Sequence, residues 1–181
     1  MSDLLLIEQC KQCNRKAQMA LYGKYSQGMF VIAKRYLKDN ASAEDAMQEA
    51  FIKAFQKLNQ FNGEVTFGAW MKRIVINTCL DAIKAAKMDL QGLNEDVFSI
   101  LDTNDDWSIT DETTIPEVLA AIEELSFNYK STVKLYLLEG YDHQEISEIL
   151  NISENASRTY LHRGKTKLKE KLKHLRYGTG S

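Results

Sequence analysis

The scarcity of proline is the strongest constraint on how this chain can fold. A single proline, Pro116, occurs in 181 residues. Proline interrupts a helix because it lacks a backbone donor and clashes with the preceding turn, so long helices are permitted almost everywhere. Apolar residues recur every three or four positions through most of the chain, and no segment keeps the alternation of a strand. The sequence therefore predicts an all-α fold.

Charge is distributed unevenly, although the formal net charge is only -2. Residues 1–87 carry 13 Lys/Arg against 8 Asp/Glu, residues 88–129 carry 11 acids and no base, and residues 130–181 carry 10 bases against 6 acids. Residues 88–115 also lack periodicity and are dense in Asp, Asn and Thr, a composition typical of a linker. We expect two small helical domains (1–87 and 116–176), an acidic linker (88–115) and a flexible tail (177–181).

The composition also excludes several classes of protein. With 44% hydrophobic and 27% charged residues, the chain is typical of soluble globular proteins. No apolar run approaches the ~18 residues that a membrane span requires. The N-terminus lacks the basic start and long apolar segment of a secretory signal. We therefore expect a cytoplasmic protein without membrane insertion.

Few residues suggest a metal or catalytic site. Cys10 and Cys13 form a lone C-x-x-C motif, and no second pair or suitably spaced histidine pair completes a zinc site. Two ordinary helix thiols are the main alternative to a metal or redox role. The three histidines are scattered, and no glycine-rich phosphate loop is present. The sequence predicts no metal, no cofactor and no enzymatic activity.

Two helical patterns meet at a tight break near Asn151. Asp142 and Glu145 have the spacing of a capping box at the start of the first helix, and Gly140 is a suitable end for the helix before it. Asn151 tolerates the left-handed conformation that a sharp turn requires, and Ser153 can cap the next helix. A short helix, a tight turn and a longer helix are typical of a helix-turn-helix.

The second of these helices is strongly basic. Eight Lys/Arg lie between Arg158 and Arg176, against the single acid Glu170. A buried stripe is expected at Leu161, Leu168, Leu172 and Leu175. A merely solvated basic face is the alternative to DNA binding. In a helix-turn-helix the N-terminal end of the second helix enters the major groove, so the DNA-contact candidates are Ser153, Asn155, Ser157, Arg158, Thr159, His162, Arg163 and Lys165.

Residues 42–58 have two distinct helical faces. Ser42 is the expected cap, and the expected core stripe is Met47, Phe51, Phe55 and Leu58. A second face of Asp45, Gln48, Glu49, Ile52 and Gln56 is acidic and polar, with an aliphatic residue at its centre. Such a face is either simply hydrated or a docking face for a partner helix.

A long helix is expected to begin near Thr66. Its core-facing candidates are Phe67, Met71, Ile74, Val75, Thr78 and Ala82. Arg73, Asn77, Asp81 and Lys84 share another stripe, with Lys72 at its edge and the rings of Phe61, Phe67 and Trp70 nearby. Aromatic rings beside cations suit the splayed bases of single-stranded DNA. The alternative is that the rings pack in the core, which is the expected role of Phe67 and Trp70.

These segments, taken together, resemble one family. The order is AEDAMQEAFIKAF (43–55), FGAWMKRIVINTCLDAIK (67–84), an acidic stretch, and EGYDHQEISEILNISENASRTYLHRGKTKLKEKL (139–172). This order is similar to that of sigma-70 family subunits of bacterial RNA polymerase, in the extracytoplasmic-function (ECF) group. The resemblance covers about residues 10–175.

The resemblance implies a function and a role for each segment. It implies a sigma factor that binds bacterial core RNA polymerase, directs it to promoter DNA and helps to melt that DNA. Asp45, Gln48, Glu49, Ile52 and Lys53 would bind the polymerase clamp helices. Phe61, Trp70, Lys72, Arg73, Asn77 and Lys84 would melt and read the minus-ten element. The helix-turn-helix would read the minus-thirty-five element, and the acidic linker would enter the polymerase. Relatives are commonly held inactive by an anti-sigma factor.

Two departures and two rival functions accompany this interpretation. Ser157 occupies a position where many relatives carry a branched apolar residue, and Asn151 one where Gly is usual. The chain could instead be a self-sufficient dimeric transcriptional regulator whose N-terminal domain senses a signal. It could also be a pure interaction protein. The segment around residues 43–55 favours the sigma interpretation, since a sensor domain has no reason to contain it.

Overall fold

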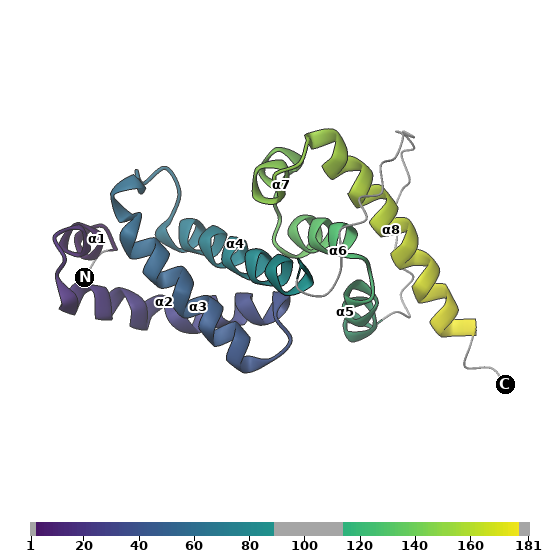
Figure 1. Cartoon of the computed structure of the whole chain (residues 1–181), viewed down its shortest axis with the longest axis horizontal. Helices are drawn as coiled ribbons and strands as arrows, with labels where there is room; N and C mark the ends of the chain where they lie inside the picture. Colours follow the sequence, from purple (N-terminus) through teal and green to yellow (C-terminus); the bar gives the residue numbers. More distant parts are fainter. Residues whose placement is uncertain (1–2, 89–113, 178–181) are drawn as a thin grey trace. The chain divides into compact units, whose positions relative to one another are not determined.

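The computed structural model describes residues 3–88 and 114–177, and within these ranges every regular element is a helix (Figure 1). The predicted all-α fold is confirmed. The chain divides into two compact units, residues 1–95 and 96–181, and each is described here by itself. The predicted linker lies outside the described residues except at its two ends, as do residues 178–181 of the predicted tail.

The described part of the first unit, residues 3–88, contains four α-helices. They are α1 (Asp3–Lys11), α2 (Arg15–Tyr36), α3 (Asn40–Gln56) and α4 (Phe67–Met88), with a short 3-10 helix, η1 (Leu58–Gln60), after α3. Helices α2, α3 and α4 pack against one another pairwise, and α1 packs on α2 and η1. The interior of this unit includes the fully buried side chains of Leu21, Leu58, Met71, Ile76 and Leu80.

The start of α3 differs from the prediction. Asp39, not Ser42, is the N-cap, and its Oδ1 accepts a hydrogen bond from the backbone N–H of Ser42 at 2.7 Å. Aspartate is as good a cap as serine, and its position lets α3 begin at Asn40. The start of α4 is close to the prediction, since Thr66 Oγ1 accepts from the N–H of Ala69 at 3.2 Å.

The predicted core of α3 is largely correct, whereas that of α4 is too narrow. Met47, Phe51 and Leu58 are buried and Phe55 is half-buried. In α4, Phe67, Met71, Val75 and Thr78 are buried, but Ile74 is only half-buried and Ala82 is exposed. The unpredicted core residues of α4 are Ile76, Cys79 and Leu80. Because α4 contacts both α2 and α3, it buries a wider face than one stripe of a surface helix.

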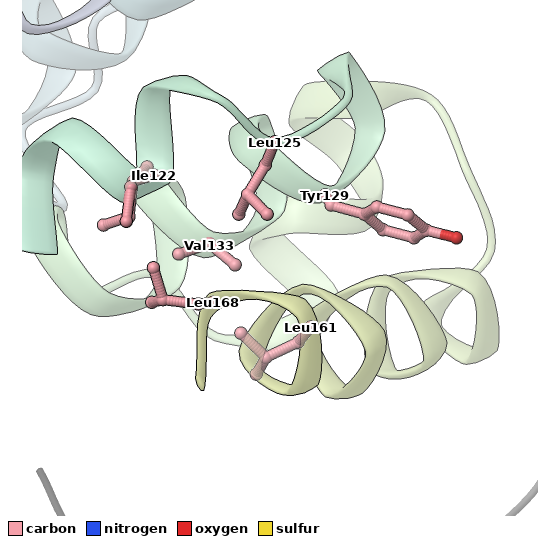
Figure 2. Close-up of a cluster of buried hydrophobic side chains, with 7 residues drawn as sticks. Ile122, Leu125, Tyr129, Val133, Leu161 and Leu168 are labelled. Atoms are coloured by element: carbon pink, nitrogen blue, oxygen red, sulfur yellow. The ribbon is translucent and has the colours of Figure 1, made fainter. Parts of the chain in front are cut away.

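The second unit is built around its last and longest helix. Its elements are α5 (Ile115–Glu123), α6 (Phe127–Val133), a π-helical segment η2 (Lys134–Leu138), α7 (His143–Leu150) and α8 (Glu154–Tyr177). Ile122, Leu125, Tyr129 and Val133 pack in one cluster with Leu161 and Leu168 of α8 (Figure 2). Leu172 is half-buried, and the side chain of Leu175 lies outside the description. The predicted stripe is therefore confirmed at Leu161 and Leu168.

The turns on either side of α7 follow the sequence closely. Asp142 accepts from the N–H of Glu145 at 2.8 Å, and Glu145 accepts from the N–H of Asp142 at 3.0 Å, which completes the predicted capping box. Asn151 adopts the left-handed conformation with φ 55°, and Gly140 has φ 78°. Ser153 Oγ accepts from the N–H of Ala156 at 3.1 Å and so caps α8. The predicted helix-turn-helix is present.

A buried ion pair fixes α5 against η2 and was not predicted. Lys134 is only 4% exposed, and its ammonium group pairs with the carboxylate of Glu123, which also lies 3.4 Å from Lys130 Nζ. Burial by itself raises the pKa of Glu123, but the two lysines outweigh it, so the net shift lowers that pKa. The Glu123 carboxylate is therefore held in its charged form where α5 meets η2.

Candidate functional site

One face of α3 remains exposed after α3 has packed into the first unit. Asp45, Gln48, Glu49, Ile52 and Gln56 are all exposed, and Ile52 is 58% exposed. Glu49 pairs with Lys53 at 2.8 Å, and Gln48 Nε2 donates to Glu44 at 3.3 Å. We call Asp45, Gln48, Glu49, Ile52 and Lys53 the α3 face. It offers an aliphatic centre surrounded by charged and amide groups, a composition suited to binding a protein.

Lys53 links the α3 face to α4. Its ammonium group lies 3.5 Å from Thr78 Oγ1, and Thr78 is buried and donates to the carbonyl of Ile74 at 2.9 Å. Lys53 is half-buried, in contrast with the other members of the face. Lys53 therefore lies at the edge of the α3 face and not at the centre of that face.

Three aromatic rings meet where α4 begins. The ring centroids of Phe61 and Phe67 are 5.9 Å apart, those of Phe61 and Trp70 5.4 Å, and those of Phe67 and Trp70 5.7 Å. We call these residues the aromatic cluster. Phe67 is 3% exposed and Phe61 7%, whereas Trp70 is half-buried. Phe61, predicted to contact DNA, is therefore a core residue here, because Phe67 and Trp70 pack against it.

An exposed loop connects Phe61 to Phe67 within the aromatic cluster, and the sequence did not mark it as a candidate contact. Residues 62–66 are all exposed, Gly63 has φ 81°, and Asn62 Oδ1 accepts from the N–H of Glu64 at 3.1 Å. The Asn-Gly pair is a turn signal that could have identified this loop. Val65 is 51% exposed at its tip. The loop and Trp70 together present the accessible part of this end of α4.

The predicted polar stripe of α4 is present and partly accessible. Lys72, Arg73, Asn77 and Lys84 are all half-buried. Asn77 Oδ1 is itself buried and has no hydrogen-bond partner within the described residues. A buried acceptor left without a donor is unusual and is often explained by function.

The basic surface of α8 begins at its first turn. Asn155 and Arg158 are exposed, while Thr159, His162, Arg163 and Lys165 are half-buried. Arg158 makes an ion pair with Glu154 one turn earlier, at 3.4 Å and in an exposed position. Such exposed pairs contribute little, typically ~0–1 kcal/mol. Arg158 can therefore exchange Glu154 for a phosphate or a base at small cost.

Ser157, predicted to contact DNA, is instead an interior residue. Its side chain is fully buried, and a hydrogen bond of 2.9 Å joins its Oγ to Nδ1 of His143, the first residue of α7. The side chain faces α7 and is enclosed between the two helices. The hydrogen bond therefore joins α8 to α7 in the interior of the unit.

The junction between η2, α7 and α8 holds further contacts that the sequence reasoning missed. The Tyr136 ring stacks on the His143 imidazole with centroids 5.1 Å apart, and Lys165 Nζ lies 5.4 Å from the Tyr136 centroid. Burial, then the positive charge of Arg158, lowers the pKa of His143. The π-helical turn that presents Tyr136 has no clear sequence signal.

Among residues 3–88 and 114–177, no three His, Cys, Asp or Glu side chains gather as a metal site requires. Cys10 is a buried free thiol and Cys13 an exposed one. Over the same ranges, no helix combines the length and the apolar character needed to cross a membrane.

Two family models match the chain, one in each unit. The model described as Sigma-70 region 2 matches residues 21–88, and the model described as Sigma-70, region 4 matches residues 116–168. The first match includes the α3 face and the aromatic cluster. The second includes the whole of α7 and the first part of α8.

Relatives match along nearly the whole chain. The chain is 26% identical to the ECF RNA polymerase sigma-E factor of Haemophilus influenzae over 188 residues, covering 97% of each chain. It is 25% identical to the protein of the same name from Escherichia coli strain K12 over 190 residues, covering 97% of this chain and 96% of the relative.

Solved structures share the fold. The structure of CnrH in complex with the cytosolic domain of CnrY matches with a TM-score of 0.58 and 20% identity, over 94% of this chain and 97% of that one. The sigma factor RpoE from Bartonella quintana, in complex with the anti-sigma factor NepR, matches with a TM-score of 0.58 and 18% identity, over 86% and 96%. With region 2 and region 4 present in order and relatives matched end to end, the chain belongs to the ECF group of the sigma-70 family of RNA polymerase sigma factors.

Proposed function

We propose that three surfaces of this sigma factor have separate binding roles. The α3 face binds core RNA polymerase, the region around the aromatic cluster engages the melted minus-ten element, and the basic surface of α8 reads the minus-thirty-five element. The observation that carries the proposal is the exposed α3 face, with Ile52 58% exposed, on the same chain as a basic helix-turn-helix. A face suited to a protein partner, on the same chain as a DNA-binding motif, is what a factor that joins polymerase to a promoter requires.

The α3 face suits a protein partner better than a nucleic acid. Asp45 and Glu49 are exposed carboxylates, which repel phosphates, whereas Ile52 gives apolar area that a partner helix can cover. Glu49 and Lys53 form an ion pair with each other, and each can replace this contact with one to a charged group of a protein partner. Polymerase binding by this face would therefore combine a small apolar centre with a polar rim.

The α4 end suits unpaired bases. Trp70 offers a partly accessible ring backed by Phe61 and Phe67, and the stripe of Lys72, Arg73, Asn77 and Lys84 supplies cations and an amide. Stacking of a base on an aromatic ring is worth roughly 1–3 kcal/mol, comparable with the few kcal/mol that unstacking a base costs. Capture of separated bases here would hold the strands apart. The exposed loop of residues 62–66 joins these residues as a candidate contact.

The first turns of α8 suit the major groove. Asn155, Arg158, His162, Arg163 and Lys165 remain as candidates for base or phosphate contacts. Ser153 Oγ accepts from the N–H of Ala156 as the cap of α8, and Thr159 donates its hydroxyl to the carbonyl of Asn155 at 2.9 Å, so both hydroxyls are already engaged within the helix. Ser157 is excluded by its burial.

Three further features of the proposal follow from the family. The protein catalyses no reaction itself and acts in the cytoplasm by redirecting an enzyme. The solved relative RpoE is bound by the anti-sigma factor NepR, and we propose that an anti-sigma factor also regulates this chain. The acidic segment around residues 88–115, which lies outside the described residues except at its ends, is proposed to enter the polymerase.

Run-off transcription tests the proposal directly. Bacterial core polymerase is supplied with genomic fragments, with and without the full chain, and start sites are mapped. New starts sharing two upstream elements are expected. Asp45→Lys is expected to abolish polymerase binding without loss of helicity, because it reverses a charge on the exposed α3 face. Gln12→Lys, which introduces a lysine at an exposed position outside the α3 face, serves as a control for the added positive charge.

Two outcomes would overturn parts of this proposal. If Asp45→Lys keeps full polymerase affinity, the α3 face is not the binding surface. If the chain gives no new starts but protects DNA without polymerase, it is a self-sufficient regulator. Replacing Arg158 by Ala is expected to weaken binding at the minus-thirty-five element by about 1–3 kcal/mol if it contacts a base. An equal loss on all sequences would make it a phosphate contact.

A further inference from the structure

Helix α1 lies outside the segment that matches region 2 and contacts the rest of the first unit at two places. The family match begins at residue 21, whereas α1 spans Asp3–Lys11. Leu6, Ile7 and Cys10 form its buried side, which packs on α2 and on η1. Because η1 leads directly into Phe61, α1 braces the segment that carries the first ring of the aromatic cluster.

The second contact is polar and joins the start of α1 to α2. The carboxylate of Asp3 pairs with the ammonium group of Lys24, and the Tyr25 hydroxyl donates to Asp3 Oδ2 at 2.6 Å. The hydrogen bond from Lys24, then that from Tyr25, lowers the pKa of Asp3. Burial, then the bond to Asp3, raises the pKa of Tyr25 to about 12. Both groups therefore keep the protonation states that this hydrogen bond needs throughout the neutral range.

Tyr25 passes this attachment on to the aromatic cluster. Its ring meets the Phe67 ring edge-on with centroids 5.1 Å apart. It also lies so close to the first turn of α4 that a Cβ on Gly68 would be 3.1 Å from Tyr25 Cε1. Phe67 in turn contacts Phe61 and Trp70. A continuous set of contacts thus runs from Asp3 through Tyr25 and Phe67 to Trp70, the ring proposed to stack on bases.

We propose that Asp3 and Tyr25 are positioning residues, which hold the aromatic cluster in the arrangement that captures unpaired bases. The inference rests on the proposed function of the cluster. Neither residue touches DNA in this scheme. Asp3 fixes the Tyr25 ring, the ring fixes Phe67 and the first turn of α4, and these fix Trp70. Promoter opening therefore depends on the N-terminal helix, although that helix lies outside the matched region.

The test uses two conservative variants of the full chain and one matched control. Asp3→Asn removes the charge that holds Lys24 and Tyr25, and Tyr25→Phe removes the hydroxyl while keeping the ring against Phe67. Glu8→Gln is the control, because it breaks the 2.9 Å ion pair to Lys11 in the same helix and does not touch the Asp3–Tyr25 contact.

The first measurement needs no polymerase. The chain has two tryptophans, Trp70 and Trp107, so a Trp107→Phe background leaves Trp70 as the reporter. Acrylamide quenching of the Trp70 fluorescence is expected to change in Asp3→Asn and Tyr25→Phe and to stay unchanged in Glu8→Gln. Quenching that is the same in all four proteins would overturn the inference.

The second measurement separates positioning from simple loss of folding. On duplex promoter DNA, holoenzymes with either variant are expected to open the minus-ten element about fivefold less, the lower end of the cost of one lost base stack. Affinity for core polymerase is expected to be unchanged, and a pre-melted template is expected to restore most of the transcription. Equal losses on both templates, together with lost polymerase affinity, would make the contact merely structural and overturn the inference. Unchanged opening on duplex DNA would overturn it as well.

The two measurements also distinguish this inference from the proposed function. If the wild-type chain opens no promoter, the proposed function fails. Trp70 quenching then still decides whether Asp3 and Tyr25 hold the cluster in place.

Discussion

Gly164, in α8, has the least room for a side chain among the glycines that the structure describes. A Cβ there would lie 2.7 Å from Cγ2 of Val133 and 3.5 Å from Cβ of Tyr129. We expect Gly164→Ala to destabilise the second unit by ~1–2 kcal/mol, because overpacking against the fully buried Val133 outweighs the ~1 kcal/mol that alanine gains in a helix. Native-state hydrogen exchange of the α6 and α8 amides measures the change locally.

A matched glycine provides the control for this prediction. Gly23 lies within α2 with nothing within 4 Å of the Cβ position, so Gly23→Ala is expected to stabilise the first unit by roughly 0.5–1 kcal/mol. In a Val133→Ala background the loss caused by Gly164→Ala is expected to shrink, since the clashing methyl groups are removed. Stabilisation by Gly164→Ala alone would show that α8 moves to accept the methyl group.

At the residue scale, the sequence predicts what depends on neighbours in the chain. Asn151, Asp142 and Ser153 adopt their predicted turn and capping roles, because each role is set by residues within a few positions. Ser157 and Phe61 were both assigned to DNA and are both buried. Ser157 is buried against His143, 14 residues away, and Phe61 is buried against Trp70, on the far side of the 62–66 loop. A helical period in the sequence reveals neither contact.

At the scale of elements, α7 and α8 are held together by a titratable contact. His143 bonds to the buried Ser157 and faces Tyr136, Arg158 and Lys165 from η2 and α8, with Asp142 and Glu154 as the nearby acids. Its pKa is lowered from 6.5, so the unfolded chain binds its proton more readily than the folded chain. We expect the second unit to be most stable above pH 6.5 and to lose stability as the pH falls through the lowered folded-state pKa.

Variants and NMR check this expectation. In His143→Asn the fall in stability just below pH 6.5 is expected to disappear, since the amide can replace Nδ1 but does not titrate. His162→Asn should keep the fall, because it leaves the bond to Ser157 intact. Losses that begin only near pH 4 arise from carboxylates such as Glu123, whose pKa is also lowered. An NMR titration that places the His143 pKa at or above 6.5 would contradict the prediction.

The order and the ends of the elements are the part of the fold that the sequence predicts best. The helix-turn-helix is marked by its caps, whose hydrogen bonds lie within four residues. The breadth of the α4 core and the π-helical turn at Lys134–Leu138 were missed. Both depend on packing: α4 contacts two helices at once, and the turn coincides with the burial of Lys134 against Glu123. Such tertiary effects override local propensity.

For the whole molecule, the order of the segments carries more information than any one of them. A basic helix-turn-helix alone fits many regulators, and an exposed mixed face such as that of α3 alone fits a hydrated surface. Their presence in one chain, in the order region 2 then region 4, identifies the family. Each unit closes a core from its own helices. The proposed promoter recognition, in contrast, requires both units to engage one polymerase at once.

This requirement predicts that the covalent connection is essential for activity. We expect residues 1–95 and 96–181, expressed separately, each to keep their helicity by circular dichroism, because the chain divides into two compact units between them. Mixed at micromolar concentration with core polymerase, they are expected to give at least about 10²-fold less run-off product than the intact chain, since tethering turns the second binding event into an intramolecular one. The first fragment is expected to retain polymerase binding through Asp45 and Ile52. If the mixed halves match the intact chain, recognition does not depend on joint engagement, and the minus-thirty-five contact adds little to the complex. If they fail in proportion to dilution, the connection between two independently folded units is itself a functional part of the sigma factor.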